Sequence, residues 1–115
     1  HAKTRQRRTV HVSPNLVEWL AKYPSASGPI TPLRNNAWHR AVEKIVEGVR
    51  RLDNNFCLPH NAARHSFCSS HFALPQHENL TAAEAGNSPA IVFRNYRALV
   101  THADAKRYWN IRPSR

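Results

Sequence analysis

Apolar residues recur at helical spacing over much of the chain. A stripe formed by Leu16, Val17, Trp19 and Leu20 follows Ser13-Pro14. A hydroxyl residue followed by proline is a common helix start, so the pattern predicts a helix over 14–22. A longer stripe follows Thr31-Pro32 and predicts the longest helix, ending near Leu52. Its apolar positions are Leu33, Trp38, Ala41, Val42, Ile45, Val46 and Val49.

Four shorter helices are predicted downstream from capping signals and apolar spacing. They are a helix over 61–73, a short helix from the capping box Thr81-x-x-Glu84 to Gly86, a helix that starts at Ser88-Pro89 and holds Tyr96, and a last helix from the capping box Thr101-x-x-Asp104 through Ile111. At the front, "TVHVS" alternates as a strand does, so residues 1–12 are expected to form a basic hairpin or strand. The predicted fold is one domain, mainly α with a small antiparallel β element, whose helical part covers 13–111.

The net charge of the chain is the strongest indication of the kind of partner it binds. The chain has 115 residues, with 17 Lys+Arg against 7 Asp+Glu, a net +10 with histidines neutral. Such a surface favours a polyanionic partner, nucleic acid first and an anionic membrane second. No apolar run approaches the roughly 20 residues of a spanning helix, and no signal-peptide pattern opens the chain. Two cysteines make no disulfide framework and favour a reducing, cytoplasmic compartment. The lack of methionine suggests a fragment of a longer protein.

The first candidate surface is the basic N-terminal segment. Lys3, Arg5, Arg7 and Arg8 cluster within six positions. Beside a strand, such a cluster can reach phosphates or enter a groove. The alternative is a solvated, frayed terminus.

A second candidate is a zinc site. Cys57 and His60 have the spacing C-x2-H, and Cys68 and His71 repeat it. Two thiolates and two imidazoles can close a tetrahedral zinc site. The spacing between the two pairs fits no standard finger, and Cys68 is equally consistent with a small buried apolar residue. A zinc-stabilised binding domain therefore remains an alternative.

Arg64 is a third candidate. Its neighbours on the predicted helix are small or apolar, namely Ala62, Ala63 and Phe67. An arginine in such a half-buried place is expected to have an anionic partner. Acidic residues are scarce nearby, and a guanidinium matches a phosphate with two parallel hydrogen bonds. A structural salt bridge is the competing interpretation.

These segments together resemble a known family. "NAARHSF", "EAGNS" and "FRNYRALV" are similar, in this order, to the C-terminal part of the tyrosine recombinases, the phage-integrase family. That family carries His-x-x-Arg-His, then Leu-Gly-His, then a nucleophilic tyrosine. Here Asn87 follows Arg64 by 23 positions and Tyr96 follows Asn87 by nine, which agrees with the family. "AKTRQRRTVHV" resembles its β-hairpin, which places Lys3 on the catalytic lysine.

The resemblance implies an integrase-type catalytic domain, truncated at its N-terminus. Tyr96 would attack a DNA phosphodiester in line, leaving a 3′-phosphotyrosine and a free 5′-hydroxyl. Arg64 would hold the non-bridging oxygens, and Lys3 would protonate the leaving oxygen. Arg94 and Arg97 would contact DNA, and no metal or other cofactor is expected. The implied partners are double-stranded DNA and further copies of the chain in a synaptic tetramer, with the last helix exchanged between protomers.

The match departs from the family pattern at two positions. Asn61 and Asn87 stand where the family has histidines, so the group that takes the proton of Tyr96 is open, with His60 and His65 as candidates. The family's first catalytic arginine would precede Lys3. The chain alone is therefore expected to show little or no strand transfer. A non-catalytic nucleic-acid-binding module, decayed from an integrase, is the main alternative function. The resemblance also implies a nucleoid-associated protein of a prokaryote or phage.

Overall fold

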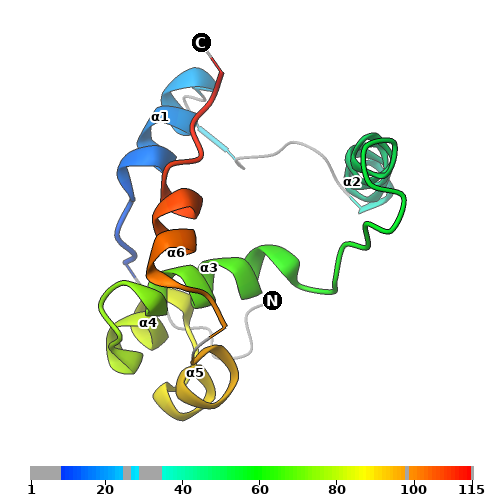
Figure 1. Ribbon diagram of the computed structural model, residues 1–115. Coiled ribbons are helices and arrows are strands. Elements are labelled where there is room, and N and C mark those ends of the chain that lie inside the picture. Colours follow the sequence, from blue (N-terminus) through cyan, green and yellow to red (C-terminus); the bar gives the residue numbers. More distant parts are fainter. Residues whose placement is uncertain (1–8, 25–26, 29–34, 98, 115) are drawn as a thin grey trace. The chain divides into compact units, whose positions relative to one another are not determined.

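The computed structural model describes residues 9–24, 27–28, 35–97 and 99–114. They contain six helices (Figure 1) and no strand. The chain divides into two compact units: His1–Pro24 together with Ala63–Arg115, and Ser25–Ala62. The part of the chain that is described is all-α, and none of its helices is long and apolar enough to cross a membrane.

The predicted β element is not present where the structure describes it. Residues 9–12 form no strand, and residues 1–8 lie outside the described residues. The physical reason is visible at His11, whose backbone N–H donates to the Glu84 carboxylate at 2.9 Å. A side chain of a helix, rather than a neighbouring strand, takes the hydrogen bond that a ladder would need.

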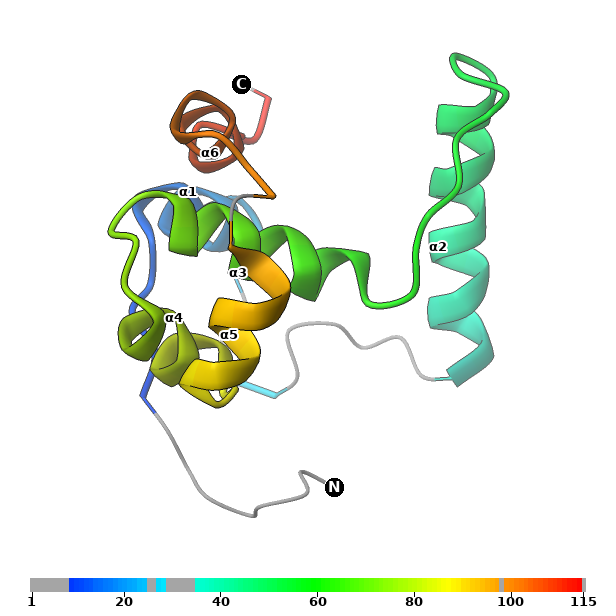
Figure 2. The same ribbon diagram turned by 60° about the horizontal axis from the view of Figure 1, so that its bottom comes forward.

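The first unit is built around a central helix. It contains α1 (Pro14–Lys22), α3 (Ala62–Ala73), α4 (Glu78–Ala85), α5 (Pro89–Tyr96) and α6 (His102–Trp109). Figures 1 and 2 show α1 and α6 on one side of α3, and α4 and α5 on the other. The core lies where α3, α4 and α5 meet. It consists of Cys68, Phe72, Ala82, Ala85, Val92 and Tyr96, with Phe67 packed against it.

α6 is attached to α3 by aromatic contacts. The Trp109 indole donates to the Ser70 carbonyl at 3.2 Å, and its ring meets Phe67 edge-on, with centroids 5.8 Å apart. On α1, Trp19 donates to the Ile111 carbonyl at 3.3 Å. The last helix therefore packs on its own chain in this structure.

The second unit contains α2 (Asn35–Arg50), a 16-residue amphipathic helix. Its apolar positions have the predicted helical spacing, and the helix ends two residues before the predicted end at Leu52. Beyond it the chain turns, and the Arg50 Nε donates to the Phe56 carbonyl at 3.1 Å. The expected helix start at 31–34 lies outside the described residues.

Helix starts depend on capping side chains, and the predicted caps at Ser88 and Thr101 are confirmed, whereas Ser13 holds the N-cap position of α1 without a side-chain cap hydrogen bond. The Ser88 hydroxyl accepts from the backbone N–H of Ile91 at 3.4 Å. The Thr101 hydroxyl accepts from the backbone N–H of Asp104 at 3.1 Å and donates to its carboxylate at 2.6 Å. α1 has the predicted bounds, whereas α6 ends at Trp109, two residues before Ile111.

One capping prediction is wrong. α4 begins at Glu78, and the His77 ring accepts from the backbone N–H of Leu80 at 3.4 Å. Thr81 therefore lies inside the helix, fully buried, where its hydroxyl meets the His71 Nδ1 at 2.8 Å. The Thr81 hydroxyl is therefore hydrogen-bonded to His71 on another helix and does not cap α4. The predicted end is correct, because Gly86 adopts the left-handed conformation, with φ 65°, that glycine tolerates best.

Candidate functional site

Arg64 and Asn87 are brought together from different parts of the first unit. Arg64 lies in the first turn of α3, and its Nη2 donates to the Asn87 Oδ1 at 2.6 Å. Asn87 stands between the left-handed Gly86 and the N-cap of α5, so two turn signals fix its position. Its amide also donates to the Cys68 Sγ at 3.7 Å.

Arg64 is exposed, so the expectation that it is half-buried is wrong. The buried part of α3 begins only at Cys68, one turn later. The guanidinium pairs with a neutral amide, so its positive charge is not cancelled by an ion pair among the described residues. It also lines a cavity of about 280 Å³ together with Glu84 and His11. Arg64 thus keeps donor groups that an anion can use.

Tyr96 occupies the core. Only 4% of its surface is exposed, because Val92 and Tyr96, four positions apart, share the face of α5 that packs into the core cluster. Its ring lies 5.6 Å from the His65 ring, measured between centroids. The expectation that Tyr96 is free to face a phosphate is therefore wrong for this conformation.

Burial also changes the acidity of Tyr96. It raises the pKa of the phenol, the neighbouring Cys68 thiol raises it further, and the positive charge of Arg64 lowers it. Loss of water penalises the charged form, and one exposed guanidinium does not offset that. In this conformation the phenol holds its proton more tightly than a free tyrosine does.

Cys68 is the small buried apolar residue that the sequence allowed, but its position beside Tyr96 was not predicted. It is fully buried between Asn87 and Tyr96. Burial raises the pKa of its thiol, while Arg64 and hydrogen bonding to Tyr96 and Asn87 lower it. The available signal was its spacing: Cys68 follows Arg64 by four positions, which places both on one helical face.

Each of the other predicted site residues is either exposed or outside the described residues. Lys3, Arg5, Arg7 and Arg8 lie outside the described residues. Asn61, with a left-handed φ of 57°, is exposed and belongs to the second unit. Arg94 is exposed, and the exposed Arg97 guanidinium lies 4.9 Å above the Phe93 ring.

The predicted zinc ligands do not form a site within the described part of the chain. No group of three or more His, Cys, Asp or Glu residues could hold a metal ion there. Cys57 is exposed in the second unit and Cys68 is buried in the first. Cys68 and His71 instead pack in or beside the core.

No protein-family model, no curated protein and no solved structure matches the chain. The function must therefore be inferred from the residues and their geometry. They offer a cationic guanidinium, an amide group, an imidazole and a phenol around one end of α3 and α5.

Proposed function

We propose that the chain carries the C-terminal part of a tyrosine-recombinase catalytic domain, which breaks and rejoins double-stranded DNA through a 3′-phosphotyrosine. The observation that supports this most is the hydrogen bond from Arg64 to Asn87, with the His65–Tyr96 ring contact beside it. Three separate sequence motifs converge at one place, at the spacing that the family resemblance requires.

The chemistry divides among these residues. The Tyr96 oxygen forms a bond to phosphorus as the bond to the 5′-oxygen breaks, so one phosphodiester replaces another and no external energy is needed. Arg64 donates to the non-bridging oxygens, where charge develops. The Asn87 amide supplies one further donor. His65, whose ring lies 5.6 Å from the Tyr96 ring, would take the phenolic proton, and Lys3 would supply the proton for the leaving oxygen.

The proposal includes a movement of α5. The phenol must leave the core before its oxygen can meet a phosphate, because its exposure is only 4%. Outside the core the desolvation that raises its pKa disappears, and nearby positive charge favours the phenolate. α5 is short, eight residues from Pro89 to Tyr96, so the displaced element is small.

An activated diester tests the nucleophile without knowledge of the DNA target. Thymidine 3′-(4-nitrophenyl phosphate) has a leaving group that needs no protonation. Attack by Tyr96 would release 4-nitrophenolate and leave thymidine 3′-phosphate on the phenolic oxygen. Mass spectrometry of the digested protein should locate this adduct on Tyr96. Tyr96→Phe should abolish it, whereas Tyr108→Phe should leave it unchanged. An adduct that persists in Tyr96→Phe would overturn the assignment.

A non-catalytic nucleic-acid-binding module is the second candidate. The burial of Tyr96 among Cys68, Phe72 and Val92 favours it, since the tyrosine then serves the core alone. This candidate predicts that the chain binds duplex DNA while the activated diester leaves Tyr96 unmodified. Assembly into a tetramer with exchange of α6 stays a prediction. Its test is the oligomeric state on DNA after removal of residues 101–115.

A further inference from the structure

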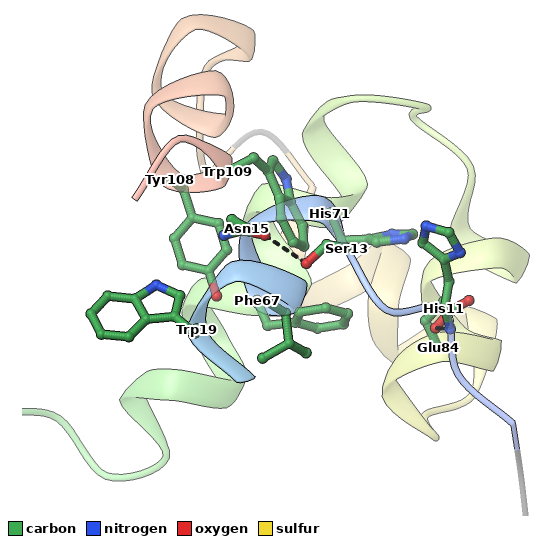
Figure 3. Close-up of a pocket in the computed structure, with 10 residues that line it drawn as sticks. His11, Ser13, Asn15, Trp19, Phe67, His71, Glu84, Tyr108 and Trp109 are labelled. Carbon is green, nitrogen blue, oxygen red and sulfur yellow. Dashed lines mark hydrogen bonds between the residues drawn. The ribbon is translucent and has the colours of Figure 1, made fainter. Parts of the chain in front are cut away.

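A further cavity lies inside the first unit, next to the cavity that Arg64 lines. The two cavities share the wall residues His11, Leu16, Phe67 and Glu84. The volume of the further cavity is about 210 Å³. It opens among α1, α3, α4 and α6 and the segment before α1 (Figure 3). Its walls are His11, Ser13, Asn15, Leu16, Trp19, Phe67, His71, Glu84, Tyr108 and Trp109. None of the residues predicted for DNA cleavage is among them.

One end of the cavity is aromatic. Trp109 meets Tyr108 nearly at a right angle, 86° between ring planes with centroids 5.1 Å apart, and meets Phe67 at 79°. Trp19 extends these walls beyond Tyr108 (Figure 3). Rings that meet edge-to-face leave further faces and edges to contact a guest ring. A cavity of about 150 Å³ suffices for benzene, so this one has room for a benzene-sized ring with a short arm.

The other end carries a negative charge. Glu84 lies there beside His11, away from Trp19 (Figure 3). One carboxylate oxygen, Oε2, accepts the backbone N–H of His11 at 2.9 Å, and no hydrogen bond is found for Oε1 among the described residues. No lysine or arginine among the described residues lines the cavity, although the chain has 17 of them. Burial lowers the pKa of His71, whose Nδ1 is already paired with the Thr81 hydroxyl. The cavity therefore favours a cation at the Glu84 end.

We propose that this cavity binds a small aromatic amine, with its ring against the aromatic walls that Trp109 and Phe67 form and the ammonium group on Glu84. The volume limits the ligand to one ring and an arm of about two carbons, since pockets for drug-sized ligands measure about 300–1,000 Å³. A carboxylate with a free oxygen matches the donors of a primary ammonium. The proposal does not rest on the proposed recombinase function.

Phenethylammonium chloride and 2-phenylethanol form a matched pair of probes. They share the ring and the two-carbon arm and differ in the charged end. Isothermal titration calorimetry on the full chain should show saturable binding of the amine. The alcohol should bind at least about tenfold more weakly, because it lacks the charge-assisted hydrogen bond to Glu84. Equal affinity for the two probes, or no binding of the amine, would overturn the proposal.

Variants locate the binding. Glu84→Gln keeps the size of the side chain and should remove the preference for the amine. Glu43→Gln, which makes the same change in net charge on an exposed position of α2, should preserve it. Leu16→Trp replaces a wall side chain that is 43% exposed with a larger one. It should block the binding of both probes while the far-UV circular dichroism stays unchanged. Amine binding that survives both Glu84→Gln and Leu16→Trp would place the ligand elsewhere and contradict the proposal.

Discussion

At the scale of single residues, Tyr96 contributes a large buried ring and one hydroxyl group. Tyr96→Phe keeps the ring and removes only the hydroxyl, so its cost should be about 1 kcal/mol or less. Tyr96→Ala removes the ring and leaves a cavity, with an expected loss of about 3–5 kcal/mol. Urea denaturation followed by circular dichroism measures both. Comparable costs for the two variants would mean that the hydroxyl, and not the ring, holds α5 in place.

His71 makes stability depend on pH. Burial lowers its pKa in the folded chain, against the opposing effect of Glu84, and His11 lowers it further. The unfolded chain therefore binds the proton more readily. The stabilisation is fully present above the ordinary histidine pKa of about 6.5 and is lost as the pH falls through the folded-state value.

The melting temperature should accordingly fall between pH 7.5 and pH 5. In His71→Gln, whose amide can still bond to Thr81, this decrease should be smaller. His102→Gln, an exposed residue at the start of α6, is the control and should retain the full decrease. A decrease that is unchanged in His71→Gln would assign the effect to other groups.

At the scale of elements, the start of α6 depends on Thr101. Its hydroxyl caps the helix through the Asp104 N–H. Thr101→Ala should destabilise the first unit by about 0.5–2 kcal/mol, whereas Thr101→Ser should recover most of this loss because it keeps the hydroxyl. Trp109 attaches α6 to α3. In Thr101→Ala, the change in tryptophan fluorescence that accompanies unfolding should therefore occur at a lower urea concentration. An unchanged midpoint would show that packing alone sets this helix.

Local signals predicted the helices better than the sites. The Ser88 and Thr101 caps and the Gly86 stop act through neighbours within four residues, so the sequence reveals them. Thr81 was misassigned because a distant partner, His71, binds its hydroxyl. The burial of Tyr96 was one of two interpretations that the sequence allowed. Its apolar neighbours on a predicted helix favoured a core position, and the family spacing favoured a nucleophile. The packing of three helices buries the ring in this structure, and no short sequence pattern encodes that packing.

At the scale of the whole molecule, the net charge of +10 should dominate binding to DNA. Affinity for duplex DNA should fall steeply with salt, because each neutralised phosphate releases counterions. Fluorescence anisotropy between roughly 50 and 200 mM KCl, where such losses are large, gives the slope of log K against log salt.

Arg94 and Arg97, at the C-terminal end of α5, should contribute to the slope of log K against log salt. Arg94→Gln with Arg97→Gln should weaken binding equally for unrelated sequences and reduce the slope by about two, one for each phosphate contact. Lys106→Gln with Arg107→Gln removes the same charge from α6 and is the matched control. Arg107 already pairs with Asp104 at 3.3 Å, so this control should change the slope less.

The two cysteines differ completely in exposure, since Cys57 is exposed and Cys68 is 0% exposed. A thiol reagent should therefore modify the chain in two phases. The fast phase belongs to Cys57, and the slow phase belongs to Cys68, which reacts only when α5 separates from α3. The ratio of the two rates measures how often this core opens under native conditions. If DNA draws Tyr96 out of the core, the slow phase should accelerate when DNA is added, and the reaction rate of Cys68 would then report the motion that the proposed function requires.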